Sequence, residues 1–337
     1  MLRDYGAAKT TFGRVSKMLP GSSEVPHALG LIARREGQWD QSIAYFEQAL
    51  ALDPRNVALL SNAAWGYGWR RRFPAALKLY DRVLDITPND PTMMAAKASI
   101  YQADGNLKEA ATFLTEINLQ TSSSYAFDTK IIQLRFERNY REAVQLLQAR
   151  VAQFHYPSQL EKGADQVTLA LIQRLTGDTA GAKVTAEQAR DTLEPLYRDQ
   201  QDDWASALPL SQAYAVMGEK DLALKLAERA ITILPTSNDA VNGPGLEENL
   251  ALIRAMFGEN SRAISMLTQL LQTSYTSDFE PWVITPAILR LDPLWDPLRA
   301  DPAFQKLCEE KQPSAALVRQ GACYRARPWL ISVSLGI

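Results

Sequence analysis

The sequence predicts an all-α protein, a right-handed superhelix (α-solenoid) built of helix-turn-helix hairpins. Its 337 residues carry one pattern several times at a fixed offset: Pro54 and Pro88 close two copies, and Phe46 and Tyr80 precede them at equal distances. Corresponding positions in these copies are 34 residues apart. Self-similarity of this length is typical of stacked repeats, in which each unit buries its apolar face against its neighbours.

Each copy contains two helix signals separated by a turn. In the first full copy, apolar and small residues recur at helical spacing over residues 26–35 and 39–52. Gly37, between them, can take the left-handed conformation that ends a helix. Pro54 disfavours helix at the residue before it and so stops the second helix. Each copy is therefore expected to form an antiparallel helical hairpin.

The units resemble tetratricopeptide repeats (TPR), whose motif places large and small residues at set positions along such a hairpin. The motif positions of the first three units hold Leu29, Gly30, Gly37, Trp39, Phe46, Ala49 and Pro54, then Leu60, Ala64, Tyr67, Phe73, Ala76, Tyr80, Val83 and Pro88, then Met94, Ala98, Tyr101, Gly105, Leu107, Ala110 and Leu114. Later units keep fewer of these positions, and their spacing lengthens to about 40 residues. We expect the array to change curvature near residue 155.

These patterns divide the chain into five segments. Residues 1–22 match the second half of a repeat, 23–155 hold the 34-residue repeats, 156–279 hold longer, divergent repeats, 280–311 form a C-terminal cap, and 312–337 form a disordered tail. Because a solenoid end with an uncovered apolar face needs a capping element, the half-repeat predicts that the chain starts within a longer protein. The alternative is that this first helix is itself an imperfect cap.

The predicted cap carries three Asp-Pro pairs, beginning at Asp292, Asp296 and Asp301, each suited to start a helix. This segment resembles the end of repeat arrays in bacterial multidomain signalling proteins. That resemblance implies a kinase, nucleotide-cyclase or winged-helix DNA-binding domain upstream of Met1.

Composition and residue types exclude several functions. A net charge of −2 gives no reason to expect nucleic acid, and no apolar run is long enough to cross a membrane. Only Cys308 and Cys323 are present, which excludes a disulfide framework and favours a cytoplasmic protein. His27 and His155 have no metal-ligand spacing, and no phosphate loop or activated nucleophile is present. The chain is thus predicted to hold no metal, no cofactor and no catalytic site.

Binding of a protein or peptide is the function that the sequence favours. In the TPR family, one side of the first helix of each unit lines a concave groove. Projected onto this sequence, that side holds His27, Leu31, Arg34, Arg35, Ser61, Trp65, Trp69, Ser99, Gln102, Asp128, Ile132, Arg135 and Phe136. Aromatic residues and arginines are common anchors of interfaces. The alternative for the two tryptophans is packing against the neighbouring repeat.

Two further sequence features bear on which ligand the groove could bind. Residues 70–72 are three arginines at a turn, predicted to be a solvated corner, with capture of an acidic peptide as the alternative. Some TPR proteins clamp a peptide carboxylate with Lys, Asn and Arg. Only Asn62 matches that set here, because His27, Leu31, Thr92 and Ala96 hold the other positions, which disfavours the chaperone-adaptor role.

Three hypotheses follow for the function. The leading one is a protein-interaction scaffold that binds a peptide or helix in the groove, as the regulatory arm of a longer bacterial signalling protein. The second is the C-terminal part of an enzyme, a nucleotide cyclase or protein kinase, whose catalytic domain precedes Met1. The third is a stand-alone assembly adaptor. The identity of the partner and the oligomeric state stay open.

Overall fold

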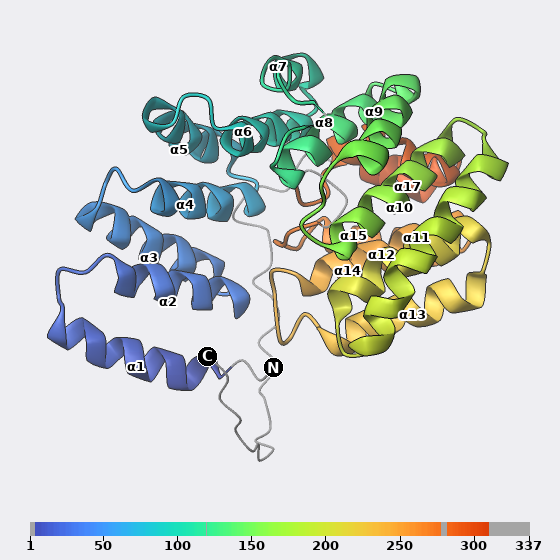
Figure 1. Ribbon diagram of the computed structural model, residues 1–337. Coiled ribbons are helices and arrows are strands. Elements are labelled where there is room, and N and C mark those ends of the chain that lie inside the picture. The colour runs from blue at the N-terminus through green and yellow to red at the C-terminus, as the bar shows by residue number, and fades with distance from the viewer. Residues whose placement is uncertain (1–3, 119, 278–281, 310–337) are drawn as a thin grey trace.

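The computed structural model describes residues 4–118, 120–277 and 282–309, and all regular elements in these ranges are helices (Figure 1). The prediction of an all-α solenoid is confirmed. The predicted tail, 312–337, lies outside the described residues. The elements are α1 Tyr5–Met18, α2 Glu24–Arg35, α3 Trp39–Leu52, α4 Val57–Trp69, α5 Phe73–Ile86, α6 Pro91–Asp104, α7 Leu107–Thr112, α8 Ser124–Phe136, α9 Tyr140–Gln153, α10 Gln159–Leu175, α11 Thr179–Asp199, α12 Trp204–Met217, α13 Lys220–Ile233, α14 Gly243–Met256, α15 Asn260–Leu270, α16 Pro286–Leu291, the 3-10 helix η1 Pro293–Leu298 and α17 Pro302–Glu309.

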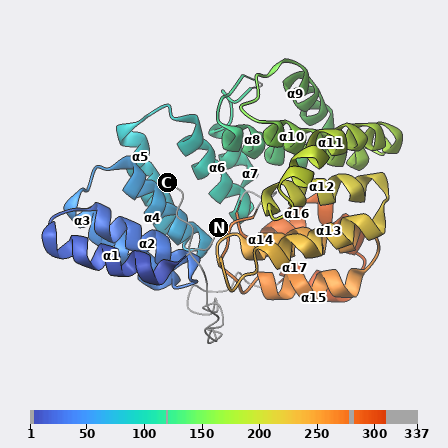
Figure 2. The same ribbon diagram turned by 60° about the horizontal axis from the view of Figure 1, so that its bottom comes forward.

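Helices α2 to α15 pair in order as hairpins, from α2–α3 to α14–α15, and α1 packs alone against α2. Successive hairpins stack side by side along the curved array, as both views show (Figures 1 and 2). Helices α10 and α11 are 17 and 21 residues long, which accounts for the longer spacing of the repeats there.

The repeat positions form the core between the helices. Phe46, Ala49, Ala76 and Tyr80 are completely buried. A Cβ atom on Gly30 would lie 2.9 Å from the Phe46 ring, so this motif position requires glycine for α2 and α3 to pack closely. Burial of this kind contributes roughly 25 cal/mol per Å² of apolar surface, which explains why the pattern persists from unit to unit.

Each of the seven hairpin turns in the described residues contains one residue with a positive φ angle. Five are glycines, and the other two are Arg71 and Arg138, with φ of 55° and 56°. A side chain in this conformation strains the backbone by about 1–2 kcal/mol. Glycine would adopt the backbone conformation of these two arginines without strain.

The C-terminal cap differs in one detail from the prediction. Asp292 and Asp301 accept hydrogen bonds from Leu294 N and Ala303 N at helix starts, as expected. The prediction that Asp296 caps a helix is wrong, because this residue lies inside η1 and its carboxylate pairs with arginine side chains instead.

The array curves until its last part meets its first part. We call residues 271–277 and 282–298, which follow α15, the return segment. Figures 1 and 2 show it between the early hairpins and the late ones. The early and late hairpins also touch at a point that precedes the return segment in the sequence, because Ala240 N donates a hydrogen bond to Arg35 O at 2.8 Å. The inner face of the early hairpins is consequently not open along its whole length.

Candidate binding groove

The inner face of α4 and α6 is covered by Trp282 of the return segment. The Trp282 ring lies edge-on to Trp69, with ring centroids 6.2 Å apart, and its Nε1 donates to Ser99 Oγ at 2.6 Å. Gly68 leaves room for the indole, since a Cβ atom there would lie 2.7 Å from it. Thr285 Oγ1 adds a hydrogen bond to Ala103 O at 2.7 Å. This part of the expected groove is filled by the chain itself.

Arg71 fixes the return segment from the turn between α4 and α5. Its guanidinium donates to the carbonyl oxygens of Thr273, Leu270 and Ile284 at 2.9, 3.3 and 3.0 Å. Only 7% of Arg71 is exposed, and burial lowers its pKa to about 10. The prediction of a solvated corner is wrong for Arg71 and for Arg70, which is 3% exposed, because the return segment and the neighbouring hairpin cover them.

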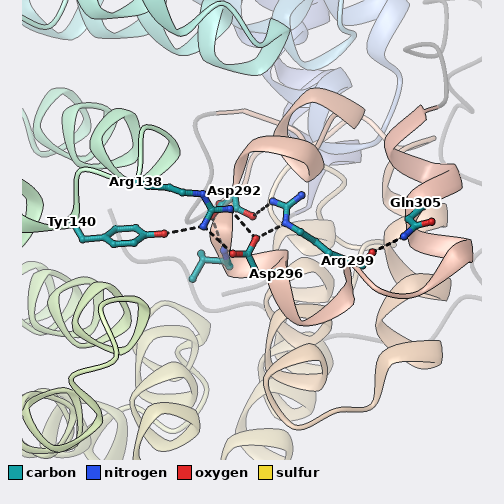
Figure 3. A network of polar contacts seen from close by, with 7 residues as sticks. Arg138, Tyr140, Asp292, Asp296, Arg299 and Gln305 are labelled. Atoms are coloured by element: carbon teal, nitrogen blue, oxygen red, sulfur yellow. Dashed lines mark hydrogen bonds and ion pairs between the residues drawn. The ribbon is translucent and has the colours of Figure 1, made fainter.

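Two more arginines bind the cap from α8 and the turn that follows it. Arg135 forms a buried ion pair with Asp292 at 2.7 Å. Arg138 donates to both carboxylate oxygens of Asp296, at 2.9 and 3.1 Å, and to the hydroxyl of Tyr140 (Figure 3). Arg299 contacts Asp296 from the other side (Figure 3). The Arg138 pair is about half exposed, so the buried Arg135 pair is the stronger constraint.

An open cavity of about 410 Å³ lies further along the array, between α8, α10 and α12, with residues 276–277 at one side. Its wall is largely apolar. The larger apolar side chains include Ile132, Leu160, Leu171, Ile172, Trp204 and Leu208. A concave, mainly apolar space with a few polar groups is the usual form of a binding site.

Three carboxylates of the described residues line this cavity. Asp165, on α10, is 7% exposed, forms an ion pair with Arg150 at 3.1 Å and accepts a hydrogen bond from the Tyr156 hydroxyl at 2.6 Å. Glu161, one turn earlier, accepts a hydrogen bond from Ser124 Oγ at 2.9 Å. Asp128, on α8, is exposed to the cavity and has no hydrogen bond or ion pair within the described ranges. The cavity walls that surround this carboxylate raise its pKa, and so does the nearby charge of Asp165.

Arg150 is held in place by aromatic rings as well as by Asp165. Its guanidinium lies 4.1 Å from the centroid of the Phe127 ring and 3.8 Å from that of Phe154. Arg150 also donates to Thr121 O at 2.9 Å, and only 1% of it is exposed. This cation is therefore buried behind the cavity wall and is paired with Asp165.

Residues 27–91 match the family model described as tetratricopeptide repeat. The chain contains tetratricopeptide repeats. The chloroplastic TPR domain-containing protein PYG7 of Arabidopsis thaliana is 35% identical over 68 residues, which is 20% of this chain. That match spans 23% of the length of PYG7.

Two solved structures share the fold. A TPR protein from Parabacteroides merdae has a TM-score of 0.51 at 17% identity, over 74% of this chain and 92% of that one. The human IFIT1 dimer with PPP-AAAA has a TM-score of 0.50 at 15% identity, over 78% of this chain and 65% of that one. At these identities the likeness shows the fold alone.

The predicted groove residues lie in three different places in the structure: at the cavity, against the later part of the chain, and elsewhere on the first four hairpins. Asp128, Ile132 and Arg135 line the cavity. Trp69, Ser99 and Arg35 contact the later part of the chain, Arg35 through an ion pair with Asp239 at 2.5 Å. The remaining residues do not converge on one site.

Those remaining residues lie on or between the helices of the first four hairpins. Ser61, Gln102 and Phe136 are buried between neighbouring helices. Half-buried positions on α2 and α4 are held by His27, Leu31, Arg34 and Trp65. The Trp65 ring stacks on Trp69, and the Arg34 guanidinium lies 5.2 Å from the centroid of the Trp69 ring.

Sequence reasoning missed the half of the cavity that α10 and α12 supply, including Leu160, Glu161, Trp204 and Leu208. The projection of the concave side stopped at the fourth TPR unit, where the 34-residue spacing ends. The inward-facing positions of the first helices in the longer units, counted onward from Asp128, are the signal that identifies these residues.

No described helix has both the length and the apolar character needed to cross a bilayer. Within the described ranges, no group of three or more His, Cys, Asp or Glu side chains is arranged to hold a metal ion.

Proposed function

We propose that this TPR chain is a protein-interaction scaffold that binds a peptide or helix of a partner in the cavity between α8, α10 and α12. The observation that carries the proposal is the contrast between two parts of the inner face. Trp282 and its neighbours cover the face of α4 and α6, whereas the later cavity is open and exposes an uncommitted carboxylate, Asp128. Asp128, Ile132 and Arg135 are the groove residues predicted from sequence that belong to this proposed site.

A cavity-filling variant tests this proposal. Ala164 of α10 lines the cavity and is half-buried, so Ala164→Trp places an indole in it without disturbing the helix core. Ala51→Trp, at an exposed position of α3, is the matched control. Peptides selected from a displayed random library on the full chain should bind Ala164→Trp at least tenfold more weakly than Ala51→Trp. Equal binding to both variants, or no selected peptide, would contradict the proposal.

The surface formed by His27, Leu31, Arg34 and Trp65 is a second proposed contact. Its support is that these side chains are half-buried on α2 and α4, and that Arg34 and Trp65 both lie against the Trp69 ring. Binding by this surface alone would persist in Ala164→Trp and be lost in Trp65→Ala.

The biological setting is a separate part of the proposal. We propose that the scaffold acts in the cytoplasm as the regulatory arm of a longer bacterial signalling protein, supported by the resemblance of residues 280–311 to the ends of such arrays. The competing proposals are the C-terminal part of a nucleotide cyclase or protein kinase, and a stand-alone assembly adaptor. The intact mass of the protein from its native source separates them, because a mass well above 37.5 kDa favours the first two and a mass of 37.5 kDa the adaptor.

A further inference from the structure

We propose that the cavity between α8, α10 and α12 selects a partner segment with a basic side chain, Lys or Arg, flanked by apolar residues, and that Asp128 contacts the cation. This inference rests on the proposed function and specifies the chemistry of the partner. Glu161 is the second carboxylate available to the cation.

The side chains that line the cavity carry more negative than positive charge, as a site for a basic side chain requires. Of the three carboxylates that line it in the described part of the chain, Asp165 is already paired with Arg150. Among the described residues that line the cavity, the one cation is Arg135, and it is paired with Asp292, which is itself completely buried. Asp128 and Glu161 are left without a cationic partner within the described ranges. A ligand that supplies one positive charge offsets part of this excess of negative charge, whereas an anionic ligand would add to the repulsion.

The shape of the cavity favours a basic side chain over a small inorganic cation. No group of three carboxylate, thiol or imidazole side chains within the described ranges could hold a metal ion. The apolar wall includes Leu160, Trp204 and Leu208, which suits an alkyl stem and neighbouring apolar residues. Lysine and arginine pack their methylene groups along apolar surface while the charged end reaches a polar group. The ligand chemistry is thus one cation at the end of an apolar arm.

Repulsion among the carboxylates gives the cation its advantage. Enclosure by the cavity walls raises the pKa of Asp128 most, the nearby carboxylates of Asp165 and Glu161 raise it further, and Arg150 opposes them. Bringing a positive charge to Asp128 relieves this repulsion, in addition to forming a charge-assisted hydrogen bond. Because Asp128 is solvent-exposed, salt is expected to weaken the interaction.

The test uses three pools of acetylated, amidated, fluorescein-labelled heptapeptides that differ only at the centre: Arg, the neutral isostere citrulline, or Glu. The flanking positions are a degenerate mixture of Leu, Ile, Ala and Ser. Binding to the full-length chain is measured by fluorescence anisotropy. We expect the Arg pool to bind roughly threefold to tenfold more tightly than the citrulline pool, as for one charge contact in a partly exposed site.

Matched variants assign the effect to Asp128. Asp128→Asn should reduce Arg-pool binding to the level of the citrulline pool, whereas Asp85→Asn, which removes the same charge from an exposed position of α5, should leave it unchanged. Asp128→Lys should reverse the preference, so that the Glu pool binds more tightly than the Arg pool. Circular dichroism of each variant checks that the helices are intact.

The outcomes separate this inference from the function on which it rests. Equal binding of the Arg and citrulline pools, both blocked by Ala164→Trp, would overturn the basic specificity and leave the cavity as a peptide site. Failure of all three pools to bind, or binding unaffected by Ala164→Trp, would overturn both. An Arg preference that persists in Asp128→Asn would overturn the role of Asp128.

Discussion

Arg71 and Arg138 occupy equivalent turn positions two hairpins apart, both with positive φ, and both bind the return segment. The equivalent residues Gly37 and Gly105 instead pack against Ala240 and Ala287, where an added Cβ would lie 3.3 Å from each alanine Cβ. The first four hairpin turns therefore all face later parts of the chain. The glycines permit close approach, and the arginines supply hydrogen bonds at the expense of backbone strain.

The two arginines should respond differently to glycine. Arg71→Gly relieves strain but removes three hydrogen bonds to carbonyl groups, of which Leu270 O alone keeps a second donor within the described residues, Thr273 N, so the free energy of unfolding should fall by about 2–4 kcal/mol. Arg138→Gly removes a half-exposed ion pair, worth about 0–1 kcal/mol, and an exposed hydrogen bond to Tyr140, and the relief of backbone strain should offset most of that loss. Urea unfolding of both variants measures the contrast. Equal losses would mean that Arg71 does not hold the return segment.

Gly68 should be intolerant of a side chain because Trp282 lies against it. Gly68→Ala places a Cβ 2.7 Å from the indole, and such overpacking should lower the free energy of unfolding by about 1–3 kcal/mol. The control is Gly13→Ala on α1, where the Cβ meets nothing within 4 Å and should stabilise the helix by about 0.5–1 kcal/mol. Tryptophan fluorescence during unfolding reports on both the fold and the indole. A Gly68→Ala protein as stable as the wild type would refute this packing.

Substitutions of Tyr80 can measure separately how much its buried ring and its hydroxyl contribute to the free energy of unfolding. The side chain is completely buried and its Oη has no hydrogen-bond partner in the described structure. Tyr80→Ala should cost about 3–5 kcal/mol, as for other large-to-small core changes. Tyr80→Phe keeps the ring and removes an unsatisfied polar atom, so it should be neutral or stabilising. A large loss in Tyr80→Phe would reveal a partner for the hydroxyl, and a loss below about 1 kcal/mol in Tyr80→Ala would mean that the repeat register is wrong.

Asp128 should make stability depend on pH in the sense opposite to a paired carboxylate. Its pKa is raised by the enclosing walls and by Asp165 and Glu161 of α10, against the opposing effect of Arg150 of α9. The folded state therefore holds the proton more tightly than the unfolded chain, whose Asp pKa is about 3.9. Stability from this group is full below that value and declines as pH rises through the raised folded pKa.

The measurement compares thermal unfolding of the wild type and Asp128→Asn across pH 4 to 9. The Asn variant should gain stability relative to the wild type as pH rises, by less than about 1 kcal/mol, because solvent screens an exposed carboxylate. Asp85→Asn is the control for the change in net charge and should follow the wild type at every pH. Parallel curves for wild type and Asp128→Asn would contradict the raised pKa.

Sequence and structure agree closely on the hairpins. The spacing of Phe46 and Tyr80, the left-handed turn at Gly37 and the helix stop before Pro54 each act within about one repeat length. Local signals of this kind specify a TPR hairpin because its helices bury their apolar faces against immediate neighbours. The open part of the candidate site was predicted only where the 34-residue register persisted, at Asp128, Ile132 and Arg135.

The sequence by itself determined the helical hairpins, their order and their core positions, since these depend on contacts between neighbouring segments. The tertiary structure alone decided that Arg71 is buried beneath residues about 200 positions later, and that Trp282 covers Trp69. The physical reason is that curvature accumulates from small rotations between successive repeats, and no local pattern encodes their sum. That sum determines which part of the inner face is closed by the chain and which part stays open around Asp128.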